Sequence, residues 1–153
     1  MTNSDAHGRG EMPTSQPAGG LRPDHAGISV GDLDASITWY RDMLGFELIR
    51  VVDIPDAEEA GRVALLRYGD FILELFSVPG AASLPEERRH PTTDLLTHGI
   101  KHVAYAVPDI AALMEDLKAK GADVVWDIAV HDGSLCAFVR DNSGNLVEFV
   151  ERP

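Results

Sequence analysis

The sequence predicts an α+β fold built from two copies of one unit, in which a strand and a helix are followed by three further strands. The segment GIKHVAYAVPD, residues 99–109, repeats in outline as PDHAGISVGD, residues 23–32. In each copy a histidine opens an apolar, strand-like stretch, a valine and an aspartate follow at matched offsets, and a helical pattern comes next. Each half also has a glutamate inside its last predicted strand. These matches indicate an internal duplication.

Length and composition narrow the class of protein. With 153 residues and 44% hydrophobic content, the chain fits one domain made of two small modules that share a core. Thirteen Lys and Arg against 25 Asp and Glu give a net charge of -12, which argues against nucleic acid or an anionic membrane as a partner. No stretch approaches the ~20 apolar residues of a membrane span. A single cysteine, Cys136, fits a reducing compartment, so a cytoplasmic protein is expected.

The predicted boundaries divide the chain into a leader and one domain. Residues 1–21 are rich in Gly, Pro, Ser and Thr and are expected to be a disordered leader, which includes His7. The domain, residues 22–153, consists of module one (22–78), a linker (79–98) and module two (99–153). The charge run at residues 86–89 and the two linker histidines, His90 and His98, are expected to be solvated. Cys136 lies in the apolar run LCAFV and is expected to be a buried structural thiol.

Module one shows a clear helix followed by three strands. Asp32 or Asp34 can cap the helix, Gly45 can end it, and an apolar stripe recurs between them at Leu33, Ile37, Tyr40 and Leu44. Strands are predicted at residues 46–53, 62–68 and 71–78, with an acidic loop between the first two.

Module two repeats this order. Its helix is predicted over residues 110–120, with Asp109 as the cap and Gly121 as the stop. Strands follow at residues 123–128 and 135–140. The turn DNSGN then leads into the last strand, LVEFVE.

Alternation along the first strand of each module separates two faces, because successive side chains point to opposite sides. One face has a histidine and small neighbours, and the other is apolar and suited to packing against a helix. The histidine faces comprise His25, Gly27 and Ser29 in module one and His102, Ala104 and Ala106 in module two. Each histidine therefore has open space above the sheet.

Two glutamates occupy equivalent strand positions. Glu74 lies in FILELF and Glu148 in LVEFVE, and each follows its histidine at a nearly equal distance along the chain. A carboxylate within a strand is costly to bury unless it is paired, hydrogen-bonded or bound to a metal. The matched positions favour a role as ligands that converge with His25 and His102.

The stretches HAGISVGDLDASITWYRDMLGFEL and DNSGNLVEFVE resemble the first strand and helix, and the closing turn and strand, of the vicinal oxygen chelate superfamily. This group includes glyoxalase I, methylmalonyl-CoA epimerase, extradiol dioxygenases, fosfomycin-resistance enzymes and bleomycin-binding proteins, and the resemblance covers residues 23–151. It implies two β-α-β-β-β modules that form open half-barrel sheets around a shared metal-binding cavity. Carried over by position, the metal ligands are His25, Glu74, His102 and Glu148. This mixed N/O set suits one divalent ion, Ni, Co, Zn, Mn or Fe.

Four protein ligands would leave two adjacent coordination positions for a small-molecule substrate with neighbouring oxygens. The resemblance, strongest to glyoxalase I at FILELF, implies a metal-dependent isomerase or lyase that abstracts a proton beside a carbonyl and stabilises the resulting enediolate on the metal. The catalytic carboxylates would be Glu148, as the base, and Glu74. Small members of the family are commonly dimers, so a homodimer is expected, with the modules pairing either within one chain or between two chains.

Two other functions stay open at the sequence level. An epimerase of the methylmalonyl-CoA or cyclic-ketone type would need a second base, which the acidic loop with Asp56, Glu58 and Glu59 could provide. A non-catalytic drug-binding or metabolite-binding protein could use the same cavity. The substrate is equally open, and the generic candidates for contact with an anionic substrate are Arg41, Arg50, Arg88, Arg89 and Lys101.

Overall fold

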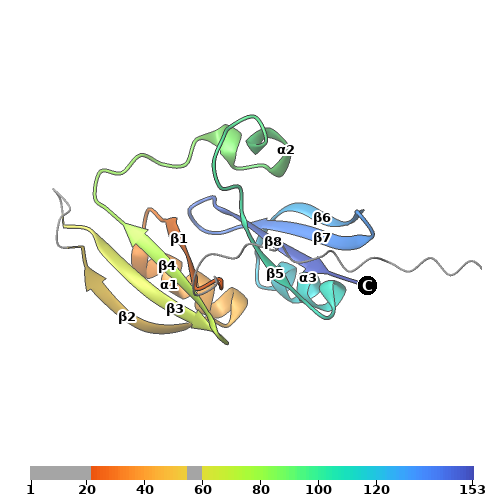
Figure 1. The fold of residues 1–153 in the computed structure, drawn as a ribbon, viewed down its shortest axis with the longest axis horizontal. Coiled ribbons are helices and arrows are strands. Elements are labelled where there is room, and N and C mark those ends of the chain that lie inside the picture. Colours follow the sequence, from red (N-terminus) through yellow and green to blue (C-terminus); the bar gives the residue numbers. More distant parts are fainter. Residues whose placement is uncertain (1–21, 55–59) are drawn as a thin grey trace, which may run out of the picture.

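The computed structural model describes residues 22–54 and 60–153, and Figure 1 shows two sheets joined by a linker. Module one contains β1 (His25–Ser29), α1 (Leu33–Leu44), β2 (Glu47–Asp53), β3 (Arg62–Tyr68) and β4 (Phe71–Ser77). Its strand order is β1-β4-β3-β2, with β1 parallel to β4 and the other neighbours antiparallel. The predicted leader and the acidic residues Asp56, Glu58 and Glu59 lie outside the described residues.

Module two repeats the topology of module one. It contains β5 (Val103–Ala106), α3 (Ile110–Ala119), β6 (Asp123–His131), β7 (Ser134–Arg140) and β8 (Leu146–Glu151), in the order β5-β8-β7-β6. The predicted fold class is therefore confirmed. Unlike the predicted solvated loop, the linker contains the 3-10 helix η1 (Glu86–Arg88) and the short helix α2 (Pro91–Asp94).

The two long helices begin where their capping residues predict. The Asp32 carboxylate accepts from the Ala35 N–H at the start of α1, and the Asp109 carboxylate accepts from the Ala112 N–H at the start of α3. Gly45 ends α1 with a φ of 76°, a left-handed conformation that favours glycine. Local capping thus sets the point at which the chain returns to each sheet.

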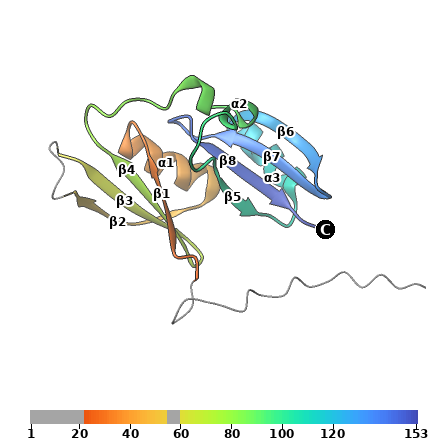
Figure 2. The ribbon, with the colours of Figure 1, turned by 45° about the horizontal axis from the view of Figure 1, so that its top comes forward.

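The helix-bearing faces of the two sheets pack against each other, with α1 between them (Figure 2). Trp39 and Leu44 of α1 pack against the buried cores of both modules. Tyr105, on the helix-facing side of β5, reaches across to module one, where its ring lies 5.9 Å from those of Phe46 and Phe71. Because the apolar faces meet in the middle, the faces that carry the candidate ligands are the opposite, outer faces of the two sheets.

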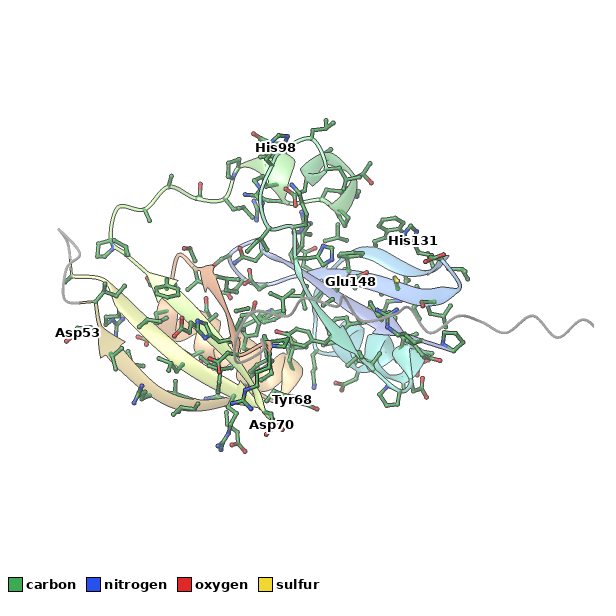
Figure 3. The ribbon with its side chains drawn as sticks, in the orientation of Figure 1. Asp53, Tyr68, Asp70, His98, His131 and Glu148 are labelled. Atoms are coloured by element: carbon green, nitrogen blue, oxygen red, sulfur yellow. The ribbon has the colours of Figure 1, made fainter. Side chains whose placement is uncertain are left out.

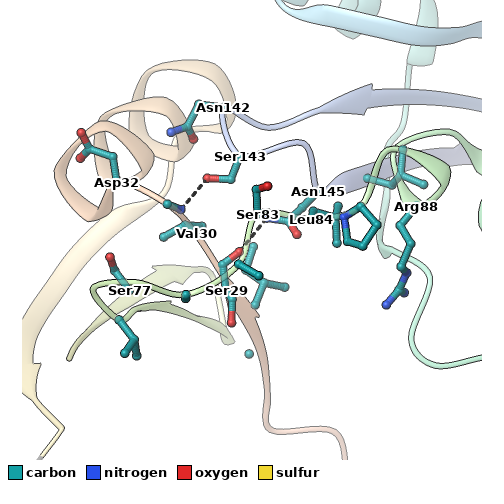
Figure 4. Close-up of a pocket in the computed structure, with 18 of the residues that line it drawn as sticks. Ser29, Val30, Asp32, Ser77, Ser83, Leu84, Arg88, Asn142, Ser143 and Asn145 are labelled. Carbon is teal, nitrogen blue, oxygen red and sulfur yellow. Dashed lines mark hydrogen bonds between the residues drawn. The ribbon is translucent and has the colours of Figure 1, made fainter. Parts of the chain in front are cut away.

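The closing turn of module two fastens the modules together (Figure 4). The Tyr40 hydroxyl donates to Asp141 at 3.0 Å, and burial, together with this carboxylate, raises the pKa of Tyr40, so the hydroxyl stays protonated as a donor. The Asn145 amide donates to the Ser29 carbonyl, and the Gly31 N–H donates to Ser143. The turn therefore links α1 and the end of β1 to the start of β8.

The edge strands β2 and β6 expose several large apolar side chains, namely Leu48, Ile49, Val51 and Val52 on β2 and Trp126, Ile128 and Val130 on β6. Exposed apolar strand edges are surfaces that a partner chain can cover. Within residues 22–54 and 60–153, none of the helices has the length and apolar character needed to cross a membrane.

Candidate functional site

The first candidate ligand pair lies on the open face of module one. The parallel register of β1 and β4 places Gly27 opposite Glu74, so Glu74 and His25 share this face. The His25 Nε2 lies 3.6 Å from a Glu74 carboxylate oxygen, and the exposed fraction of the Glu74 side chain is 24%. As predicted, the neighbours are small. A Cβ on Gly27 would lie 2.9 Å from the Phe76 ring, so a larger residue would crowd the space beside Glu74.

Asp24 orients the His25 ring and is a residue that the sequence reasoning missed. Its carboxylate lies 2.8 Å from Nδ1, the nitrogen that does not face Glu74. The hydrogen bond that the His25 ring donates to Asp24, with a smaller contribution from the Glu74 charge, raises the pKa of His25. The same contact lowers the pKa of Asp24. A carboxylate on the outer ring nitrogen is the usual support for a metal-binding histidine, and its signal in the sequence is the aspartate immediately before His25.

The second pair lies on the open face of module two, and Figure 3 shows Glu148 on the side of this sheet away from α3. His102 precedes β5 directly, and its Nε2 lies 2.8 Å from a Glu148 carboxylate oxygen. The exposed fraction of the Glu148 side chain is 15%. Each pair therefore combines one imidazole, at or just before the first strand of its module, with one largely shielded carboxylate on the neighbouring parallel strand.

Aromatic rings line the sheet beside Glu148. In the register of β7 and β8, Phe138 lies opposite Glu148, and Trp126 of β6 lies opposite Phe138. The Phe138 ring meets the His102 ring edge to face at 5.2 Å and stacks on Trp126 at 5.9 Å. The Trp126 residue is 43% exposed. One side of this half of the site is thus an apolar wall that shields Glu148 from water.

Cys136 is more accessible than predicted. The register of β7 and β8 puts it on the same face as Phe138 and Glu148, and the residue is intermediate in exposure rather than buried. Burial, followed by the neighbouring Glu148 carboxylate, raises the pKa of the Cys136 thiol. A protonated thiol is a poor nucleophile.

The two pairs do not meet within one chain. Among the described residues, no cluster contains three or more His, Cys, Asp or Glu side chains placed to hold one metal ion. The expectation that all four ligands converge in one cavity is therefore not met by a single chain. The physical reason is the back-to-back packing of the modules, which turns the face with His25 and Glu74 away from the face with His102 and Glu148.

The cleft between the modules is a separate feature. It has a volume of about 960 Å³ and is bordered by the end of β1, the linker and the closing turn of module two. Of the four candidate ligands, His102 alone lines it. Gly27 and Ser29, which share the face of β1 with His25, also line the cleft, but His25, Glu74 and Glu148 do not.

Four of the five basic residues considered as anion contacts already have carboxylate partners. Arg41 pairs with Asp42, Arg89 with Glu86, and both Arg88 and Lys101 with Asp94. Arg50 of β2 lies opposite Leu65, which in turn lies opposite Glu74. Arg50 is thus the member of this group that shares the open face of module one with Glu74.

The ligand atoms of each His–Glu pair are suited to binding a divalent metal ion. Each pair offers an imidazole nitrogen and a carboxylate oxygen, which are suitable ligands for first-row divalent ions. In both pairs the histidine Nε2 faces the carboxylate, so one ion could bind both groups. Two such pairs would complete a set of four.

Comparison with known proteins points to one family. The family model described as the glyoxalase, bleomycin resistance protein and dioxygenase superfamily matches residues 22–149. A lactoylglutathione lyase of Haemophilus influenzae is 34% identical over 131 residues, which cover 83% of this chain and 90% of that protein. A lactoylglutathione lyase of Arabidopsis thaliana is also 34% identical over 84% of this chain, but the chain spans only 43% of its length.

Solved structures agree with the fold. A glyoxalase I structure from Leishmania major has a TM-score of 0.65 and 28% identity, and the match covers 86% of each chain. A glyoxalase family protein from Enterococcus faecalis has a TM-score of 0.71 at 24% identity, covering 85% of this chain and 97% of that one. The second match supports the fold alone.

Proposed function

The chain belongs to the glyoxalase, bleomycin resistance protein and dioxygenase superfamily, and from this premise we propose that it is a metal-dependent lyase or isomerase of the glyoxalase I type. The observation that carries the proposal is the presence of two His–Glu pairs at equivalent positions of the duplicated modules. The proposed substrate class is the adduct of a 2-oxoaldehyde with a thiol, which has two neighbouring oxygens. The relatives named lactoylglutathione lyase support this reaction class.

A second copy of the chain completes the proposed site. Back-to-back modules leave each His–Glu pair facing outward, so His25 and Glu74 of one copy can face His102 and Glu148 of another. A two-fold axis would then create two equivalent sites, because each copy donates both kinds of pair. The exposed apolar strands β2 and β6 offer surface for such an assembly. Of the two pairings that the sequence leaves open, the modules are thus expected to pair between chains.

A divalent metal held by these four residues would supply a Lewis acid for the charge that develops on the substrate oxygens. A carboxylate oxygen of Glu148 would accept the proton from the substrate carbon beside the carbonyl. It would then return this proton to the neighbouring carbon, which was the carbonyl carbon. The wall formed by Phe138 and Trp126 supports this assignment, since it excludes water on one side of the carboxylate. Arg50 would contact an anionic part of the substrate from the other half of the site.

Glu148→Gln tests the assignment of the base. The amide keeps the shape of the side chain but cannot accept the proton, so turnover of a methylglyoxal–thiol adduct is expected to fall by about 10²-fold or more. Glu74→Gln is the matched variant in the duplicated module and should have the smaller effect. Exchange of the substrate proton with deuterated solvent separates proton transfer from the later steps. Loss of exchange in Glu74→Gln with normal exchange in Glu148→Gln would reverse the two roles.

The other functions considered differ from this proposal in what they require. The relatives described above give no support to an epimerase, although acyl-CoA and cyclic-ketone substrates belong in the same turnover assay. A non-catalytic binder needs no metal, so elemental analysis of protein purified without chelator distinguishes it from the enzyme. A cytoplasmic location is part of the proposal, because the single cysteine is a free thiol.

A further inference from the structure

The linker is ordered around a buried carboxylate. The exposed fraction of the Asp94 side chain is only 1%, and Asp94 Oδ1 lies 2.9 Å from Arg88 Nε and 3.4 Å from Lys101 Nζ. Lys101 also donates to the backbone carbonyls of Asp94 and Thr97. Arg88 donates in addition to the Ile100 carbonyl, at 2.6 Å. These contacts join the start of the ordered linker to its end, immediately before β5.

Gly99 allows the linker to close on this cluster. Its φ of 120° lies in a region that favours glycine, and a Cβ at this position would be 4.0 Å from the two terminal nitrogens of Arg88. The guanidinium therefore lies directly against the chain at residues 99–100. The charge run in the linker, predicted to be solvated, thus supplies a cation to an internal contact.

Asp94 is the buried member of this cluster, because the side chains of Arg88 and Lys101 are 25% and 27% exposed. The desolvation of the charges offsets much of the attraction, whereas removal of one partner leaves a buried charge uncompensated. The Arg88–Asp94–Lys101 contacts consequently favour the arrangement in which residues 99–101 are held against α2.

The residue placed by this arrangement is His102. Its backbone lies just outside the ladder of β5 and β8, which begins with Val103 opposite Val147. His25, by contrast, lies inside β1 opposite Ile72, and its ring has Asp24 as a second partner. In the described part of the chain, Glu148 is the one carboxylate within ion-pairing distance of the His102 ring. Glu148 and Phe138 contact the His102 ring, whereas the position of its backbone depends on the residues before it.

We propose that Arg88, Asp94 and Lys101 are positioning residues that hold His102 in place for metal binding. This inference rests on the proposed function, in which His102 is a ligand. The two histidines would then be held in different ways. The Asp24 carboxylate contacts the ring of His25, whereas the ion cluster holds the backbone that precedes His102.

Asp94→Asn tests the proposal, because it keeps the side-chain shape but leaves two cations without their counter-charge. Affinity for Co²⁺, measured by calorimetry well below the melting temperature, is expected to fall about tenfold or more, as for other outer supports of metal ligands. In the metal-free protein, amide hydrogen exchange should become faster at residues 99–103 and stay unchanged at residues 25–29. The matched control is Asp116→Asn, which removes the exposed Lys120 pair on α3 of the same module and should change neither measurement.

Arg88→Met is the second variant if Asp94→Asn does not fold. It removes one cation while Lys101 stays paired with Asp94, so the same changes are expected at smaller size. Co²⁺ affinity and local exchange at the wild-type level in a folded variant would overturn the positioning role. A wild-type protein that binds no Co²⁺ would instead overturn the proposed function, and the ligand-positioning role with it. Slower Co²⁺ binding without a change in affinity would also contradict the proposal.

Discussion

The contact between Asp24 and His25 is expected to affect metal binding by the His25–Glu74 pair directly. Asp24 holds Nδ1 of His25 and leaves Nε2 toward Glu74. Asp24→Asn removes the charge from this contact, and the affinity for Co²⁺ or Ni²⁺ is expected to fall by about 10-fold to 100-fold. Titration calorimetry measures the change. Asp70→Asn, in the turn between β3 and β4, is the control, and an equal loss there would contradict a specific role for Asp24.

The same contact predicts a dependence on pH. Because Asp24 and Glu74 raise the pKa of His25, its imidazolium persists to a higher pH than an ordinary histidine, whose pKa is about 6.5. A protonated ring cannot bind a metal, so metal affinity should decrease as the pH falls through the raised pKa of His25. NMR titration of the His25 ring in metal-free protein should give a midpoint above that of a model histidine. Asp24→Asn should lower the midpoint, and an unchanged midpoint would show that Asp24 does not set it.

At the level of elements, the turn between β7 and β8 holds the modules in their back-to-back arrangement. Tyr40→Phe removes the buried hydrogen bond between α1 and Asp141 while keeping the ring. The free energy of unfolding is expected to fall by about 1.5–3 kcal/mol, the range for a hydrogen bond to a charged group. Urea denaturation measures it. Tyr68→Phe, at a residue that is 58% exposed, is the control and should be nearly neutral.

The regular elements were predictable because their signals are local. Asp32, Gly45 and Asp109 mark helix ends through their own side chains or backbone freedom, and β3 and β8 have the predicted bounds. The linker was not predictable in this way. Its order depends on Asp94 meeting Lys101 across the intervening residues, and no periodic pattern signals such a contact. The apparent loop is consequently a folded element.

The candidate site was predictable in composition but not in arrangement. Strand alternation places His25 with Glu74, and His102 with Glu148, on the open faces, as the sequence indicated. Whether the pairs meet depends on which faces the modules pack together. The packing is determined by the large apolar side chains of Trp39, Leu44 and Tyr105, which bury the helix-bearing faces of the two sheets.

At the level of the whole molecule, we expect a dimer. The proposed site takes one His–Glu pair from each of two copies, and the edge strands β2 and β6 expose apolar residues that a second copy could cover. Light scattering at micromolar concentration should give the mass of two chains. The substitution Val130→Glu, on exposed β6, should weaken the assembly if this strand lies in the interface. A stable monomer that binds metal with full affinity would contradict the shared site.

The most direct test of the central claim is complementation between two inactive variants. One variant combines His25→Ala with Glu74→Ala, and the other combines His102→Ala with Glu148→Ala, so neither has a complete ligand set as a pure dimer. In a mixed dimer, one site receives all four ligands and the other receives none. Random exchange of subunits should therefore restore metal binding and turnover to about a quarter of the wild-type level, because half of the dimers are mixed and each has one site. A mixture that, after verified subunit exchange, binds no more metal than the separate variants would show that the four residues do not form a site between two chains.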